Sequence, residues 1–518
     1  MDNLHDLSGK TDIFKFKDAL KAEFFHAAEY LLNNMGQVGR ETLGMLKNNR
    51  NMKAQLDAKY LDLGMKEAGV TKLKGKELNN FIDVLEGKAK PLNDNIAKSV
   101  KETRRLLDEN RKQYIDTEKQ YGDKDVAKKI EKQYLKDYFP HYTDVKAIEA
   151  GRIQVEKLIK SKDPGRIGNK VSKEIVDNII NKQNNYYSSA IRSIMEKDGV
   201  DFVTARGKLE GLLDGIKRNS AKHMTESRKY NLPYKRTIES LKKYITESNQ
   251  VIADRMTFDL RDGENYKPNG RLDEMLGAIA DESRGGSFIN GEIARDLIDA
   301  YTGKKNLEFM AKSPQSAKVL RGLIVWNSVT KMLLSPLNNF SQQTNIHIAG
   351  KFGASYRGMV KYVKEWGANE NVRASGALVK QIVEDYVQNK VLDKFYTING
   401  MTASERMIRT VGTYVGYDHV LTNFEQAKID MAAGKIKDGF GKKGSEAMRN
   451  LERVNLWDEG QILKQEQLTP EQIQSGAFEF TANTAFMGDA IGVTPITLSP
   501  LGKLVFPLAN QPLLFGFF

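Results

Sequence analysis

The sequence has no cysteine, little proline and few histidines. Without cysteine, the chain has no disulfide, no thiolate zinc site and no cysteine nucleophile. Only 12 prolines occur in 518 residues, which favours long helices, because proline ends or kinks a helix. The histidines are far apart in the sequence, at His5, His26, His141, His223, His347 and His419. Their spacing indicates no metal site, and we predict neither a metal nor another cofactor.

The chain also lacks the short motifs of common enzyme classes. It contains no GxxxxGK[ST] loop, no GxGxxG after a predicted strand, no GxSxG, no HExxH and no calcium loop. In AIADESRGGSFING (278–291), Glu282 precedes Ser283, a local setting similar to that of the catalytic glutamate of lytic transglycosylases. The glycine-rich motif that follows in those enzymes is absent. We therefore predict no catalytic residues and no enzyme, with a transglycosylase as an alternative.

Hydrophobic periodicity predicts an all-α protein, elongated and built from long helices, with an irregular, proline-rich apolar C-terminal segment. Residues 78–136 are predicted as one or two long, highly charged helices. A weak heptad seam runs through them. Its members are Ile96, Val100, Thr103, Leu107, Asn110, Tyr114 and Thr117. We expect this seam to pair with another helix of the chain or with a second copy.

Breaks in the pattern predict five regions. They are an N-terminal long-helix region (1–145), a basic helical region (146–260), linker loops (261–291), a helical core (292–435) and a C-terminal helix with an apolar tail (436–518). The first region ends in LKDYFPHYTDV (135–145), an elbow at which Pro140 stops the helix and aromatic rings gather. Two helix starts are also marked, by Thr402 with Glu405 and by Thr469 with Pro470.

The net charge of +13 is distributed unevenly. Residues 151–250 hold 21 lysines and arginines against 12 acidic residues, a surplus that favours an anionic partner. Cations bind phosphates without reading sequence, and tyrosines such as Tyr230 and Tyr234 can stack on exposed bases. We predict a non-specific nucleic-acid site at Lys217, Arg218, Lys222, Arg228, Lys229, Lys235 and Arg236. A solvated helix face or an acidic protein partner is the alternative.

A run of amides stands beside apolar residues in TKMLLSPLNNFSQQTNIHIAG (330–350). We predict that Ser335 caps a helix with Pro336 at its first position. One face of this helix is predicted to carry Leu337, Phe340, Thr344 and Ile348, with the amides on its flanks. Buried amides must be hydrogen-bonded, so they favour one helix–helix register. We predict an assembly seam at Asn338, Asn339, Gln342, Gln343 and Asn345. A satisfied polar network inside one domain is the alternative.

The end of the chain is apolar and irregular. From Ala490 to Phe518 only Lys503 is charged, and prolines recur at positions 495, 500, 507 and 512. A membrane-spanning helix needs about 20 apolar residues without such interruption. We predict that this segment contacts protein, with a host membrane as the alternative partner.

Three stretches resemble elements of the large polyvalent protein-associated domain family of tailed bacteriophages. They are KMLLSPLNNFSQQTNI, the elbow DYFPHYTD, and FEFTANTAFMGDAIGVTPITLSPLGKLVFPLANQP (478–512). The resemblance implies an internal virion protein that is delivered with the genome into the host cell, without catalytic residues to carry over. In those proteins the tail runs on into a further helix, so we expect this chain to be a fragment or a processed product.

The leading hypothesis is therefore a non-enzymatic ejection or cargo protein of a phage virion. We expect it to form homo-oligomers or to bind other virion proteins, and to contact phage DNA. The alternatives are a cytosolic protein that binds nucleic acid non-specifically, a portal-like structural subunit, and the transglycosylase above.

Overall fold

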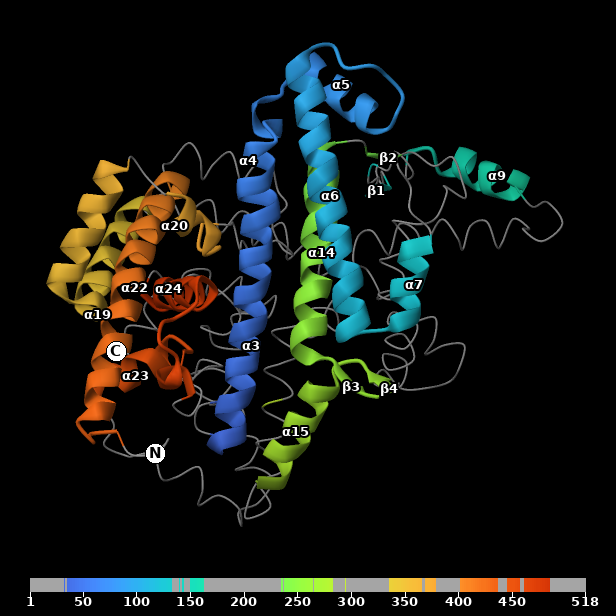
Figure 1. Ribbon diagram of the computed structural model, residues 1–518. Coiled ribbons are helices and arrows are strands. Elements are labelled where there is room, and N and C mark those ends of the chain that lie inside the picture. The colour runs from blue at the N-terminus through green and yellow to red at the C-terminus, as the bar shows by residue number, and fades with distance from the viewer. Residues whose placement is uncertain are drawn as a thin grey trace, which may run out of the picture. The chain divides into compact units, whose positions relative to one another are not determined.

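The computed structural model describes eight main stretches of the chain (Figure 1). These are residues 35–132, 150–162, 237–282 except 264, 335–365, 369–378, 401–436, 445–456 and 461–484; residues 32, 139, 142–143, 234–235 and 294 are described singly or in pairs. Within them the protein is all-α with long helices, as predicted. The chain divides into two compact units. Unit 1 comprises residues 1–63, 271–301 and 320–518, and unit 2 comprises residues 64–270 and 302–319. The predicted division into five regions stays a prediction.

Unit 2 is built on two long helices, α6 (Asp94–Gln120) and α14 (Ile238–Phe258), which pack against each other (Figure 1). Asn93 caps α6 by accepting a hydrogen bond from Ile96 N at 2.9 Å. The predicted heptad seam of α6 is buried at every position except the half-buried Val100. It packs on α14, so its partner is a helix of the same chain.

Unit 2 also contains shorter elements. They are the end of the π-helix η2 (Ala58–Gly64), α4 (Met65–Glu67), η3 (Val70–Lys72), α5 (Gly75–Leu85), α7 (Lys124–Lys132) and α9 (Arg152–Lys162). Of these, α5 and α7 pack against α6. Two short antiparallel ribbons complete the unit. One joins β1 (Tyr142–Thr143) to β2 (Tyr234–Lys235), and the other joins β3 (Leu260–Asp262) to β4 (Asn265–Lys267). The first ribbon ties the elbow, where Phe139 is buried, to the basic segment.

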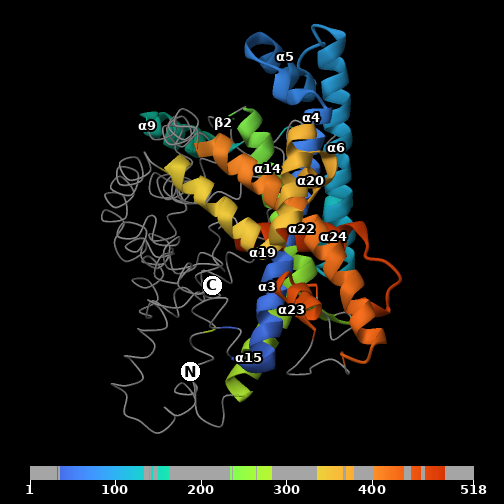
Figure 2. The same cartoon turned by 90° about the vertical axis from the view of Figure 1, so that its left-hand side faces the viewer.

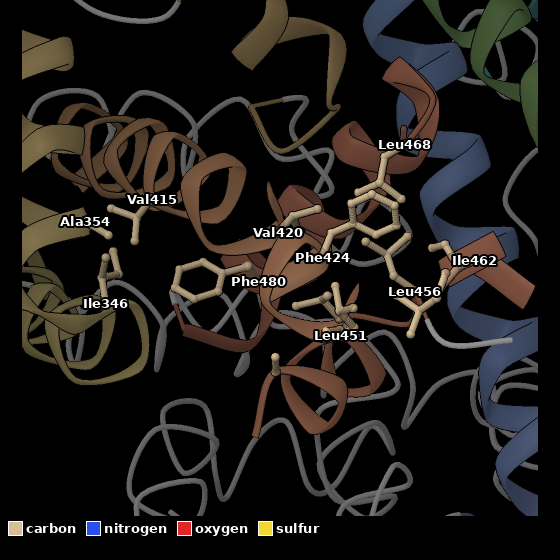
Figure 3. Close-up of a cluster of buried hydrophobic side chains, with 14 of the residues drawn as sticks. Ile346, Ala354, Val415, Val420, Phe424, Leu451, Leu456, Ile462, Leu468 and Phe480 are labelled. Carbon is tan, nitrogen blue, oxygen red and sulfur yellow. The ribbon is translucent and has the colours of Figure 1, made fainter. Parts of the chain in front are cut away.

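Unit 1 contains a bundle of α19 (Ser335–Lys364), α22 (Met401–Ala432) and α24 (Pro470–Thr484), seen in Figure 2. Its apolar core includes Ile346 of α19, Phe424 of α22 and Phe480 of α24 (Figure 3). The other elements of this unit are α3 (Gly36–Asp57), α15 (Gly270–Glu282, whose first residue belongs to unit 2), α20 (Glu370–Ala374), α23 (Glu446–Arg453) and η6 (Gln461–Lys464).

One of the two predicted helix starts is confirmed. Thr469 caps α24 by accepting from Gln472 N at 3.2 Å, and Gln472 Oε1 accepts from Thr469 N at 2.8 Å. The other prediction, a cap at Thr402, is wrong, because α22 already begins at Met401 and Thr402 is its second residue. The helix predicted to begin at Pro336 starts one residue earlier, at Ser335. Among the described helices, none is long and apolar enough to cross a membrane.

Candidate functional sites: the outer face of α19 and two buried charge clusters

The inner face of α19 holds the bundle together through small residues. Ile346 and Ala354 are buried against α22, and Gly350 lies between them, next to Val415. A Cβ atom placed on Gly358 would lie only 2.7 Å from Val415 Cγ2. Glycine thus lets the two helix backbones approach closely, and a larger side chain at this position would force them apart.

The outer side of α19 carries three exposed apolar side chains, while Met359 in the same sector is half-buried against the core. Ile348 is 75% exposed, Tyr356 63% and Val363 68%. With 100° per residue these three positions lie within about 80° of one another, over about 22 Å of helix. Ile348, the described member of the predicted face, therefore points away from the core, and Ile346 is buried instead. The sequence pattern did not determine which of these two residues would face the core.

The predicted site residues fall at the edge of what the structure describes. All five amides of the predicted assembly seam lie in α19, but their side chains lie outside the described residues. Of the seven basic residues, Lys235 lies in β2, and its side chain is likewise outside the described part. The other six, Lys217, Arg218, Lys222, Arg228, Lys229 and Arg236, lie outside it altogether.

A buried charge cluster joins α3 to α24 in unit 1. Glu479 of α24 is fully buried, and Arg50 NH2 donates a hydrogen bond to its Oε1. Glu479 Oε2 lies 3.8 Å from Lys47 Nζ and receives no hydrogen bond from the residues described here. Asn51 Nδ2 also donates to Ser475 Oγ at 2.9 Å. Two cations thus face one carboxylate inside the protein.

Further contacts extend this joint along α3. Asn455 Nδ2 donates to Asn48 Oδ1 at 2.8 Å. Beyond the charges, Gly376 lies so close to Ala54 that a Cβ atom would be 2.8 Å from that of Ala54. Gly376 has φ +83°, a conformation that favours glycine. The α3 joint therefore combines polar contacts, close backbone approach and a small apolar cluster in which Ala54 packs with the fully buried Phe478.

A second charge cluster lies at the end of α14 in unit 2. Arg255 Nε donates to Glu118 Oε1 at 3.1 Å, and its NH1 donates to Asp259 Oδ2 at 2.9 Å. Both carboxylates are 1% exposed. Burial opposes the charged form of Arg255, but the two carboxylates outweigh it and raise its pKa above the ordinary value. Burial likewise raises the pKa of Tyr266, whose hydroxyl donates to Asp259 Oδ2 at 2.7 Å.

Neither cluster has the features of a catalytic centre. Their carboxylates are shielded from solvent and held by hydrogen bonds, so a substrate has no access to them. No group of three or more potential metal ligands occurs in the described stretches. The geometry instead suits structural joints. Sequence reasoning missed Glu479 completely, and it missed Glu118 although that residue follows the seam position Thr117.

Comparisons with known proteins found no matching family model, no matching curated protein and no matching solved structure.

Proposed function

We propose that the chain is a non-enzymatic structural protein of a phage virion interior, which oligomerises and accompanies the genome into the host cell. The observation that carries the assembly part is the outer face of α19, where Ile348, Tyr356 and Val363 are exposed. The resemblance of three sequence elements supports the virion part. The apolar segment 490–518, which we predict to contact protein or a membrane, lies outside the described residues.

A second copy of the chain is the proposed occupant of this face. The face continues along the same helix from the predicted amide seam, whose uncharged polar groups favour a defined helix–helix register. Scattered exposed apolar residues are ordinary, but an aligned row along one helix is typical of a contact surface. The inner face of α19 serves the core, whereas these three side chains are exposed and available to another molecule.

The native mass of the purified chain, measured by light scattering at low and high salt, tests this proposal. We expect the wild type to form a discrete oligomer that the triple variant Ile348→Gln, Tyr356→Gln, Val363→Gln shifts toward monomer by at least tenfold in dissociation constant. A matched control is available on α22. Leu421, Ile429 and Met431 are 42%, 60% and 41% exposed there, and the same change to glutamine should leave the mass unaltered.

Two results would overturn the assembly proposal. One is a wild type that is monomeric at all salt concentrations, and the other is an equal effect of the α19 and α22 variants. Circular dichroism of each variant checks that the helices remain intact.

A second candidate is a monomer that binds nucleic acid non-specifically, which the net charge of +13 favours. It predicts strong, salt-dependent DNA binding by a chain that shows no self-association.

A portal-like subunit would differ from the leading proposal in the symmetry of its ring, which electron microscopy of the oligomer would reveal.

A further inference from the structure

The loops on either side of α5 carry a cluster of lysines at one end of unit 2. Figure 1 shows α5 beside the first turns of α6, at the end away from α7. Between residues 72 and 90 there are five lysines and three acidic residues. All five lysines are exposed. We call this set the lysine tip: Lys72, Lys74, Lys76, Lys88 and Lys90.

The loop after α5 is held in place rather than loose. Asn80 Nδ2 donates to Lys90 O at 3.1 Å, and Asn80 Oδ1 accepts from Leu92 N at 3.0 Å. Asn93 Nδ2 donates to Glu77 Oε1 at 3.4 Å. These bonds lay the second loop along α5, so the lysines are spread over about 16 Å, the length of this helix.

The charges of the lysine tip are largely uncompensated. Lys88 pairs with Glu86 at 2.6 Å, but the other four lysines have no ion-pair partner within the described stretches. Elsewhere in unit 2, exposed cations lie beside acids, such as Lys119 beside Glu131 and Lys243 beside Glu247. The tip is therefore a local positive field, because five exposed lysines gather there and only one of them is paired within the described part of the chain.

The position of these lysines also opposes helix electrostatics. Acidic residues are favoured at a helix start, because the exposed N–H groups there carry positive charge. Lys74 instead occupies the cap position of α5 without making a side-chain cap, and Lys76 lies in the first turn beside Glu77. The two lysines thus contribute nothing to the start of this helix, while Glu77 does, and residues that do not serve local stability are expected to serve another purpose.

We propose that the lysine tip binds the phosphate backbone of a nucleic acid without reading its sequence. Flexible ammonium groups suit phosphate contacts of this kind. A membrane surface is the less suitable partner, because binding there needs apolar side chains to insert. Leu92 is the one large apolar side chain exposed at the tip, while Phe81, Ile82 and Leu85 of α5 are buried. The inference deepens the proposed function, since it names a surface for the genome.

A triple variant with a charge-matched control tests this surface. Lys72→Gln, Lys74→Gln and Lys76→Gln remove three unpaired lysines of the tip. Lys119→Gln, Lys128→Gln and Lys243→Gln remove three paired lysines of the same unit. Binding of the full chain to a labelled 30-base-pair duplex is measured by anisotropy between 50 and 300 mM salt. The slope of log affinity against log salt should fall by about 2 to 3 in the tip variant and by less than about 1 in the control.

Acetylation of lysines with and without the duplex gives a second readout on the wild type. Lys72, Lys74, Lys76 and Lys90 should be protected, and Lys119, Lys128 and Lys243 should not. Equal slopes for both variants, absence of protection at the tip, or a wild type that ignores DNA would each overturn the inference. The inference would also be overturned if the tip variant lost binding to phosphatidylserine vesicles but kept binding to the duplex. That result would assign the tip to a membrane. Native mass is measured separately, so failure of assembly and failure of this surface are distinguishable.

Discussion

Arg255 in unit 2 and Glu479 in unit 1 are both buried ions at helix joints, but their surroundings differ. Arg255 lies between two carboxylates that are bonded further, since Glu118 also accepts from Asp123 N at 2.8 Å and Asp259 from Asn269 N at 2.9 Å. Glu479 instead faces two cations, and its Oε2 receives no hydrogen bond from described residues. A fully bonded cluster fixes local geometry, whereas a partly bonded one is costly for stability. We infer that the α14 end is the firmer joint and the α3 joint the weaker one.

The largest effect is expected from Arg255→Met. This change leaves Glu118 and Asp259 buried without their cation and should lower the local free energy of unfolding around α14 by about 4 kcal/mol. Hydrogen exchange of the α14 amides, followed by mass spectrometry, measures this loss. Arg105→Met is the control, because Arg105 pairs with Glu102 and Glu109 on the exposed side of α6. Similar exchange in the two variants would mean that the cluster contributes nothing beyond a surface pair.

A smaller effect is expected from Glu479→Gln in unit 1. Lys47 and Arg50 lose their shared anion, and the stability of the α3 joint should fall by about 3 kcal/mol. Adding Lys47→Met should restore part of it, because one buried cation is then removed. The readout is hydrogen exchange in α3 relative to α22, with Glu405→Gln as a control at the more exposed pair with Arg409. If Glu479→Gln leaves α3 exchange unchanged, the cluster does not hold this joint.

Periodicity and caps were sufficient to predict part of this architecture. The heptad seam of α6 and the Thr469 cap follow from local spacing, and both are confirmed. The charge clusters could not be predicted in this way. Arg255 and Glu118 are 137 residues apart, Arg50 and Glu479 are 429 apart, and the sequence has 67 acidic residues that look alike locally. The rotation of α19 was also not fixed, since Ile346 and Ile348 are equally apolar and only the partner helix selects between them.

The smallest effect is expected at the centre of the α6–α14 seam, where Asn110 and Asn249 form a buried amide pair. Asn110 Nδ2 donates to Asn249 Oδ1 at 2.8 Å, and both residues are fully buried. Asn110→Leu should lower the stability of this helix pair by about 1–2 kcal/mol, because it removes the hydrogen bond that Asn249 Oδ1 accepts inside the protein. The double change Asn110→Leu, Asn249→Leu should recover most of that loss, since two apolar side chains of similar size then meet. Urea unfolding of Asn110→Leu, Asn249→Leu and the double variant measures the coupling between the two amides. A double variant as unstable as the sum of the two single changes would mean that the amides do not act as a pair, and that each contributes through its other contacts.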